Sequence, residues 1–190
     1  MEKRCRWVTD DPIYIKYHDE EWGNPVKDDR KLFEFLVLES AQAGLSWITV
    51  LKKRENYRKA YDGFDFEKVA RYDDEKIAKL LEDPGIIRNK LKVASSVNNA
   101  KEFMKIREEF GSFSNYLWAF TGNEPINNNY MTADDVPVFT DLAVKISKDL
   151  KKRGFNFVGP TIIYSYMQAV GLVNDHTMDC SRCFYNKKTH

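Results

Sequence analysis

The chain has 190 residues, of which 43% are hydrophobic and 31% charged, a composition typical of folded globular proteins and not of disordered ones. The net charge is only +1, so any contact with nucleic acid has to come from a local patch and not from a strongly basic surface. The chain has neither an apolar run of roughly 20 residues that spans a membrane nor the apolar stretch of a signal peptide, so we expect one cytoplasmic domain over residues 1–190.

Helix signals dominate the chain, because apolar residues recur at helical spacing between capping residues and glycines. No segment shows the alternation of a half-buried strand over a useful length, so the expected fold class is all-α. The residues before Asp29 have weak helical periodicity, and residues 121–138 form the main turn-rich loop. Helices are expected to begin near Asp29, Ser46, Asp65, Asp73, Leu91, Ser114, Thr140 and Pro160. The expected stops include Gly44, Gly63, Gly111, Gly154 and Gly171.

Three cysteines are an odd number, which argues against a disulfide framework. Cys5 and His18, with His176 and Cys180, supply two thiolates and two imidazoles, a set that suits tetrahedral zinc. One helical turn would place His176 and Cys180 on one face. Four protein ligands leave no open position, so this zinc would be a structural clip between the two ends of the chain. One alternative is buried free cysteines with surface histidines, and another is Cys183 in place of Cys180. We prefer Cys180 as the ligand because it pairs with His176.

The segment LKKRGFNFVGPT, residues 150–161, predicts a helix, a short hairpin flanked by glycines, and a second helix. Glycines let a backbone approach a phosphate closely, and the N–H groups of a helix N-terminus bind oxyanions. We therefore expect a helix-hairpin-helix over about residues 141–170 to contact the DNA backbone without base specificity. A plain helical connection with solvated lysines is the alternative. The residues expected to contact DNA are Lys151, Lys152, Arg153, Gly154 and Gly159.

Aromatic side chains gather near the N-terminus, and a carboxylate follows on the first long helix. Flat aromatic faces are how enzymes hold an extruded base, and a carboxylate can read the polar edge of that base. Glu39 lies on the apolar face of its helix, where a carboxylate is costly unless a cation or a hydrogen-bond donor meets it. The alternative is that the aromatic residues are core and Glu39 pairs with a nearby Lys or Arg. The group consists of Trp7, Tyr14, Tyr17, Trp22, Glu39 and Trp47.

Seven stretches, spread over almost the whole chain, carry a resemblance to a known family. They are residues 5–8 (CRWV), 14–19 (YIKYHD), 21–23 (EWG), 38–57 (LESAQAGLSWITVLKKRENY), 85–88 (GIIR), 151–159 (KKRGFNFVG) and 171–176 (GLVNDH). Together they are highly specific. The sequence resembles the 3-methyladenine DNA glycosylase I family, which belongs to the helix-hairpin-helix glycosylase superfamily.

The resemblance implies the all-α fold of that superfamily and an enzyme that flips N3-methyladenine out of alkylated double-stranded DNA and removes it by hydrolysis. It implies one structural zinc ion per chain, with the family's ligands on Cys5, His18, His176 and Cys180. The expected partners are alkylated duplex DNA and the released 3-methyladenine, with no membrane, and the protein is expected to be a monomer. The base pocket implied by the family consists of Trp7, Tyr14, Tyr17, Trp22, Glu39, Gln42 and Trp47.

The sequence departs from the superfamily pattern in its catalytic residues. Most members carry a catalytic Asp after the hairpin, and lyase members add a Lys. No Lys follows Gly159 before residue 187, so a Schiff-base lyase is not expected. Asp175 adjoins the expected zinc ligand His176, so we interpret it as the residue that orients this ring. The resemblance implies a family that lacks the usual Asp, which leaves Glu39 as the leading catalytic carboxylate.

The implied substrate needs little machinery, because N3-alkylated adenine already carries a positive charge and leaves without protonation. An aromatic face stabilises a stacked cation by about 0.5–2 kcal/mol. Glu39 is suited to favour the cation and to accept a hydrogen bond from the exocyclic amine. Gly44 and Leu45 are expected to form the wedge that fills the gap left in the base stack.

Two other functions compete with this one. A non-catalytic DNA-binding module would keep the zinc ligands and the hairpin but would not need an aromatic pocket around Glu39. A zinc hydrolase is disfavoured, because catalytic zinc keeps one ligand position open and four protein ligands would fill all of them.

Overall fold

Helices make up almost all of the regular structure in the computed structural model, which describes residues 3–183. The all-α expectation is therefore confirmed, although the domain expected over 1–190 includes residues 1–2 and 184–190, which lie outside the described residues. The α-helices are α1 (Pro12–Glu20), α2 (Asp29–Gln42), α3 (Trp47–Ala60), α4 (Phe66–Val69), α5 (Asp74–Glu82), α6 (Lys90–Phe110), α7 (Phe113–Ala119), α8 (Asp141–Lys152) and α9 (Pro160–Ala169). The short elements are the 3-10 helices η1 (Asp62–Phe64) and η2 (Ala133–Asp135) and the strands β1 (Ile126–Asn127) and β2 (Val173–Asn174).

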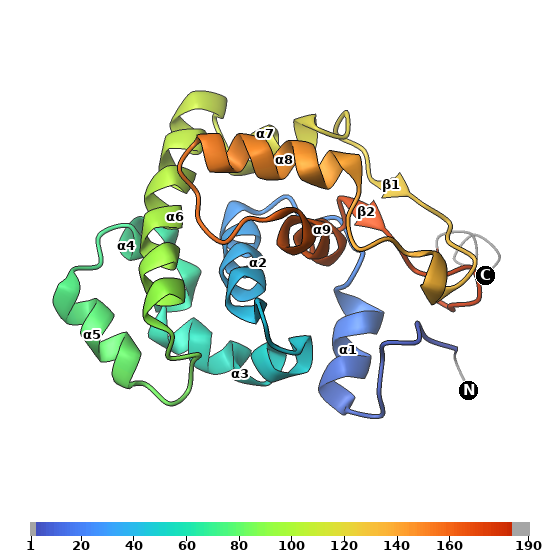
Figure 1. The fold of residues 1–190 in the computed structure, drawn as a ribbon, viewed down its shortest axis with the longest axis horizontal. Helices are drawn as coiled ribbons and strands as arrows, with labels where there is room; N and C mark the ends of the chain where they lie inside the picture. Colours follow the sequence, from blue (N-terminus) through green and yellow to red (C-terminus); the bar gives the residue numbers. More distant parts are fainter. Residues whose placement is uncertain (1–2, 184–190) are drawn as a thin grey trace.

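Helix α2 runs through the middle of the molecule, with α3, α6, α7 and α9 packed around it (Figure 1). Every residue from Leu32 to Ala41 is buried. A helix that is surrounded by protein is expected to be apolar on all sides, yet Glu34, Glu39 and Ser40 lie within this stretch. Each of the three has to be satisfied by a partner or kept as a chemically active group.

Most helices begin where the sequence predicts. Asp65, Asp73 and Thr140 cap α4, α5 and α8 by accepting hydrogen bonds from backbone N–H groups of the first turn. Helix α2 differs by one residue, because Asp28 is the cap and Asp29 is already helical. Ser46 precedes α3 as expected, but its hydroxyl bonds to Thr49 Oγ1 and not to a backbone N–H group.

Helix α1 is the main element that the sequence analysis missed. Asp11 accepts a hydrogen bond from Ile13 N, and Pro12 occupies the first helical position. Only Tyr17 and His18 are buried along this helix, so it has no continuous apolar stripe and little periodicity to detect.

The turn-rich loop is tied to the C-terminal segment by the parallel pairing of β1 with β2 (Figure 1). Strands of two residues are too short to show an alternating pattern, so they leave no trace in the sequence. The N- and C-terminal segments also lie together, since Ser181 N donates to Lys3 O at 2.8 Å. The β1–β2 pairing and the contact between the two end segments place residues from both halves of the chain around one site.

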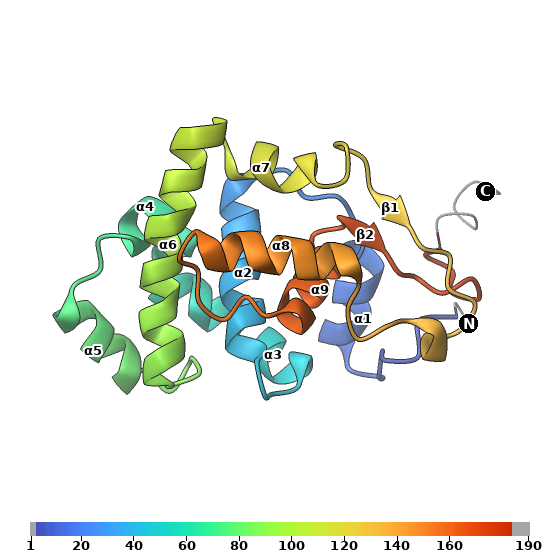
Figure 2. The same ribbon diagram turned by 45° about the horizontal axis from the view of Figure 1, so that its top comes forward.

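Helices α8 and α9 are the two helices expected to flank the hairpin, and they pack against each other (Figure 2). Gly154 adopts a φ of +97° just after α8, and Pro160 is the first residue of α9. Among the described residues, none of the helices has the length and hydropathy required to cross a membrane.

Candidate functional site

A cavity of about 620 Å³ lies between the N-terminal segment, α1, α2, α3 and the C-terminal half of the chain. A cavity of this size accommodates a small planar molecule. The residues expected to form a base pocket all line it: Trp7, Tyr14, Tyr17, Trp22, Glu39, Gln42 and Trp47.

The second half of the chain supplies cavity walls that the sequence analysis did not predict. Ser165 and Gln168 come from α9, and Asp134 and Val136 come from the turn-rich loop. No motif marks these positions, because their place at the cavity depends on the β1–β2 pairing and on the packing of α9 against α2. The other wall residues outside the expected set are Cys5, Arg6, Ala133, Asp175 and Thr177.

Glu39 is the chemically unusual group in this cavity. Its side chain is buried, and burial raises its pKa from 4.5 to about 8. Within residues 3–183 it forms no hydrogen bond or ion pair. The alternative that Glu39 pairs with a nearby Lys or Arg is therefore wrong. The ion pairs belong to Glu34, whose Oε1 accepts from Arg54 Nε at 2.5 Å and Arg58 Nη2 at 2.8 Å.

The aromatic side chains form one contiguous group. The ring centroids of Trp7 lie 5.2 Å from Tyr14 and 5.1 Å from Trp22, in edge-to-face geometry. Tyr17 lies 5.5 Å from Trp47. The indole Nε1 atoms of Trp7 and Trp47 are buried and have no hydrogen-bond partner in the described part of the chain. Unpaired buried donors of this kind are costly, and both belong to side chains that line the cavity.

Asp175 also lines the cavity, but it does not orient His176 as the sequence analysis expected. Its Oδ2 accepts hydrogen bonds from the Tyr164 hydroxyl at 2.5 Å and from Gln168 Nε2 at 2.8 Å. Its Oδ1 accepts a third from Asn128 Nδ2 at 2.7 Å. These donors come from α9 and from the loop after β1, so Asp175 fastens the loop to the cavity wall.

Beside the cavity, Cys5, His18, His176 and Cys180 are all buried and bring their ligand atoms within 4.8 Å of one another. The hydrogen bond shared between Cys5 and Cys180 raises the pKa of the Cys5 thiol and lowers that of Cys180. Two thiol groups and two imidazoles at this separation fit the donor set of a tetrahedral metal site. The cluster can therefore hold a metal ion.

Both imidazoles are oriented by an acceptor on the nitrogen that faces away from the thiols. The Nδ1 of His18 bonds to Asp19 Oδ1 at 2.7 Å, and the Nε2 of His176 bonds to the Trp22 carbonyl at 3.0 Å. This leaves Nε2 of His18 and Nδ1 of His176 directed at Cys180, at 3.4 and 3.5 Å. Asp19 was missed, although an acidic residue directly after a candidate ligand His is the signal that could have found it.

His176 and Cys180 meet through a turn and not through a helix. The residues between them are not helical, and Cys180 N donates to Thr177 O at 2.8 Å to close the turn. The expectation of a helical turn is wrong, while the expectation that the two residues meet is confirmed. Cys183 lies outside the cluster, with its Sγ 3.8 Å from Met178 Sδ.

Trp22 joins the metal cluster to the cavity. Its ring centroid lies 4.7 Å from the ring of His176 and 6.2 Å from that of His18. The same ring packs against Trp7 in the aromatic group. The two candidate histidine ligands, His18 and His176, therefore support one wall of the cavity through their contacts with Trp22.

The hairpin of residues 153–159 is held from behind by buried polar side chains. The Asn99 amide donates to Asn156 O at 2.9 Å and accepts from Asn156 N at 2.8 Å. The Ser147 hydroxyl donates to Val158 O at 2.6 Å. The carbonyls of Asn156 and Val158 are thus held by side chains from the protein interior.

The outer side of this hairpin carries unused donors. The backbone N–H groups of Phe157, Val158 and Gly159 have no hydrogen-bond partner within residues 3–183. An ideal Cβ on Gly159 would meet nothing within 4 Å, so the backbone is open to a ligand there. Successive N–H groups of this kind before a helix form an anion-binding surface.

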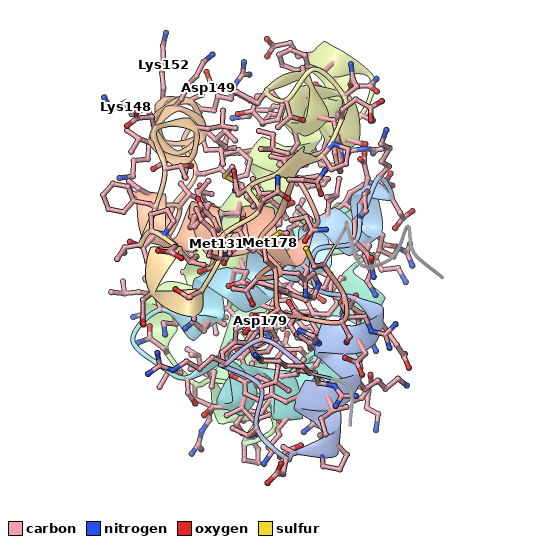
Figure 3. The ribbon with its side chains drawn as sticks, turned by 90° about the vertical axis from the view of Figure 1, so that its right-hand side faces the viewer. Met131, Lys148, Asp149, Lys152, Met178 and Asp179 are labelled. Atoms are coloured by element: carbon pink, nitrogen blue, oxygen red, sulfur yellow. The ribbon has the colours of Figure 1, made fainter. Side chains whose placement is uncertain are left out.

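The basic residues before the hairpin are not equivalent. Lys151 and Lys152 are exposed, and Figure 3 shows Lys152 projecting from the end of α8 away from the body of the protein. The Arg153 guanidinium instead bonds to Asp149 at 2.8 Å and to Glu109 at 2.6 Å. These carboxylates raise the pKa of Arg153, because both favour its charged form.

The expected wedge forms an exposed turn at the end of α2, next to Gln42. Gly44 has a φ of +77°, a conformation that side-chain-bearing residues rarely adopt. Leu45 is 38% exposed.

Known proteins that are similar to this chain in sequence and fold share one activity in their names. The family model described as methyladenine glycosylase matches residues 7–183. The chain is 48% identical to DNA-3-methyladenine glycosylase 1 of Escherichia coli (strain K12), over 96% of this chain and 97% of that protein. A crystal structure of 3-methyladenine DNA glycosylase I matches with a TM-score of 0.91 at 48% identity, over 94% of this chain and 98% of the other.

A variant of 3-methyladenine DNA glycosylase I, solved in complex with 3-methyladenine, matches with a TM-score of 0.90 at 41% identity, over 93% of this chain and 95% of the other. The expected glycosylase fold is thus confirmed by the structural matches. The similarity extends over nearly the full length of each protein, so it is not confined to a shared motif. The chain belongs to the methyladenine glycosylase family.

Proposed function

We propose that the protein is a DNA-3-methyladenine glycosylase, which removes N3-methyladenine from alkylated DNA by hydrolysis and leaves an abasic site. The observation that carries the proposal is the cavity, in which a buried carboxylate without a cation lies among aromatic faces. A flipped, positively charged purine supplies what these groups lack, a cation and a π-face. The names of the family's relatives support the same activity.

The reaction breaks the bond between C1′ of the deoxyribose and N9 of the base, and the bonding electron pair goes to the base. The base departs neutral, because its alkylation had already made it a cation. A water molecule adds to C1′ of the oxocarbenium-like sugar and loses a proton, which gives the abasic site. The protein therefore needs to extrude, hold and recognise the base more than to activate it.

Glu39 is the residue that we assign to recognition of the cation. Before a base enters, its pKa of about 8 keeps it mostly protonated at neutral pH. A cationic base nearby favours the carboxylate, and the carboxylate in turn favours the cation over neutral adenine. Its oxygen also accepts a hydrogen bond from the exocyclic amine. Trp7, Tyr14, Tyr17, Trp22, Gln42 and Trp47 complete the proposed base site.

We place the DNA on the face that carries the hairpin and the exposed turn. The N–H groups of residues 157–159 bind a phosphate, and Lys151, Lys152, Arg153, Gly154 and Gly159 form the surrounding backbone contact. Gly44 and Leu45 enter the gap that the extruded base leaves in the stack. A gap of this kind exists only in a duplex, so double-stranded DNA is the proposed substrate.

The proposed activity is that of a monofunctional glycosylase. A Schiff-base lyase needs an amine at the reacting sugar, and no lysine lines the cavity in the described part of the chain. Of the other two carboxylates of the cavity, Asp175 already accepts three hydrogen bonds from protein donors, and Asp134 pairs with Arg6. Glu39 is therefore the proposed catalytic carboxylate.

We propose that Cys5, His18, His176 and Cys180 hold one structural zinc ion. Bound there, zinc would link the two ends of the chain and keep Trp22 against the cavity. The four protein ligands leave no position for a reacting water, so the ion has no part in the chemistry. We further propose that residues 1–190 act as a single monomeric domain in the cytoplasm.

One assay separates this function from its rivals. The purified protein is incubated with methylated duplex DNA, and the released bases are identified by chromatography. Release of 3-methyladenine without strand cleavage supports the proposal. Tight DNA binding with no released base would instead identify a DNA-binding module, and strand cleavage with no released base a hydrolase acting on the backbone.

A further inference from the structure

The C-terminal end of α2 is held by a lysine from another helix. Lys92, in the first turn of α6, donates from Nζ to the carbonyl of Ala41 at 2.8 Å and to that of Ala43 at 2.6 Å. Helix α2 has no basic residue in its own last turn. The carbonyls of Ala41 and Ala43 accept from no other donor in residues 3–183, and an ammonium group opposes the negative end of the helix dipole.

The turn after α2 is closed by two hydrogen bonds between Gln42 and Leu45, one in each direction. Leu45 N donates to Gln42 O at 2.7 Å, and Gln42 Nε2 donates to Leu45 O at 2.7 Å. Gly44 between them is in the left-handed conformation. The turn is thus a rigid extension of α2, and Lys92 determines where that extension lies relative to α6.

Lys92 does not behave as an ordinary surface lysine. Its side chain is half-buried, and burial lowers its pKa. It makes no ion pair with a carboxylate of residues 3–183. A lysine on a solvated helix end normally keeps its ammonium in water, so its position on two backbone carbonyls indicates a specific structural task.

We propose that Lys92 is a positioning residue for base extrusion, because its ammonium fixes the turn that carries Leu45 against the body of the protein. This inference rests on the proposed function. A side chain that enters a base stack is pushed back by the bases, so it works only on a rigid support. Lys92 acts through Leu45 and touches neither the base nor the sugar.

The test compares Lys92→Met with Lys92→Arg, and uses Lys101→Met as the matched control because Lys101 is an exposed lysine on the same helix. The first readout is the fluorescence of 2-aminopurine placed beside a stable abasic analogue in duplex DNA, which reports insertion of the wedge without any chemistry. We expect a smaller fluorescence rise with Lys92→Met, and values close to wild type with Lys92→Arg and Lys101→Met. A wild-type response from Lys92→Met would overturn the inference.

The second readout is the single-turnover excision rate from duplex DNA, which we expect to fall by about 10-fold to 100-fold in Lys92→Met through misplacement of the wedge. Affinity for free 3-methyladenine, followed by tryptophan fluorescence, should change by less than about twofold, because Gln42 is the one cavity residue of residues 3–183 that is hydrogen-bonded to the wedge turn. A parallel loss of base affinity would overturn the inference and make Lys92 a support of the cavity.

A double-mutant cycle shows whether Lys92 acts through Leu45. Once Leu45→Ala has removed the wedge, adding Lys92→Met should cause no further loss of excision. Additive losses would contradict the assigned route. If Lys92→Met does not fold, as judged by circular dichroism, Lys92→Gln keeps hydrogen-bond donors without the charge and replaces it in the cycle. If wild-type protein releases no base, the proposed function is wrong, while the 2-aminopurine comparison still decides the role of Lys92.

Discussion

Ser40 donates a hydrogen bond of 3.2 Å from its hydroxyl to the backbone carbonyl of Phe157, and so joins α2 to the hairpin between α8 and α9. The preceding residue, Glu39, is the buried carboxylate of the cavity. Phe157 has a φ of +54°, a conformation that a residue with a side chain keeps only when its surroundings hold it. The hairpin and the cavity therefore share one support in the last turns of α2.

Ser40→Ala tests this link. It leaves the Phe157 carbonyl without its partner and should lower the free energy of unfolding by about 0.5–1.5 kcal/mol. The hairpin should loosen, so duplex affinity falls while affinity for free 3-methyladenine is retained. Urea denaturation and fluorescence anisotropy measure the two effects. Ser147→Ala, which removes the bond to Val158 O, is the control for hairpin support that does not come from α2. Unchanged stability and duplex affinity in Ser40→Ala would show that the bond is dispensable.

Residue types with rare chemistry made the site predictable in part. The four metal-cluster residues could be selected because Cys and His are few in this chain, and the aromatic residues of the cavity because they gather near the N-terminus. Glu39 stood out as a carboxylate among apolar neighbours, and its burial is what the helical period predicts. The capping residues Asp65, Asp73 and Thr140 were likewise readable from local patterns.

The remaining features depend on contacts that no local pattern encodes. The carbonyl of Trp22 orients His176, and a backbone atom has no sequence signature. Asp134 and Ser165 reach the cavity through pairings between distant segments. Asp175 was assigned to the wrong partner because adjacency in sequence to His176 was taken as adjacency of the two side chains, whereas its three donors come from elsewhere.

We expect one zinc ion per chain in protein purified without chelator. Cys183→Ser should keep the metal, because Cys183 contacts Met178 and lies outside the cluster, whereas Cys180→Ser should lose it. Chelation should lower the melting temperature, since metal binding is coupled to folding. It should also change tryptophan fluorescence, because Trp22 packs on His176. Elemental analysis checks the first two statements, and a Cys183→Ser protein without metal would reverse the assignment of the sulfur ligand.

The two lysines before the hairpin should account for more of the salt dependence of DNA binding than Arg153. Replacing Lys151 and Lys152 by Ala should weaken binding and flatten the log–log salt slope by up to about 0.9 for each phosphate that the protein no longer neutralises. Arg153→Ala should act mainly on stability, because its guanidinium is already bonded to Asp149 and Glu109. Affinities measured over a salt series give the slopes. A slope that does not change in the double lysine variant would move the DNA-binding face elsewhere.

Glu39→Gln keeps the shape of the side chain and removes its charge. The amide still offers an oxygen to the exocyclic amine, so the loss should be mainly electrostatic, on the order of 1–3 kcal/mol of transition-state stabilisation. Excision should be reduced and not abolished, because the cationic base is intrinsically a good leaving group. Single-turnover rates measure this effect, with binding of abasic-site DNA as the control that should stay the same. Equal rates for wild type and variant would make Glu39 a structural acid and direct attention to Asp175.

The raised pKa of Glu39 also predicts how stability depends on pH. In the unfolded chain this group loses its proton near its ordinary pKa of 4.5, whereas in the folded protein it keeps the proton up to about pH 8. Between these values the folded state binds more protons than the unfolded state, so stability falls as pH rises. Glu39→Gln cannot titrate and escapes this loss. As pH rises between the two pKa values, the free energy of unfolding of the variant should therefore increase relative to that of wild type by a few kcal/mol, at about 1.4 kcal/mol per pKa unit.

Urea denaturation of both proteins at about pH 5 and about pH 8.5 makes the comparison. Taking the difference between the two proteins at each pH removes the contributions of every other titrating group, the metal ligands included, because these are common to both. A difference that is the same at both pH values would mean that Glu39 ionises near its ordinary pKa in the folded protein. The cavity would then hold a fixed negative charge before any base enters, and proton release from Glu39 would not accompany recognition of the cation.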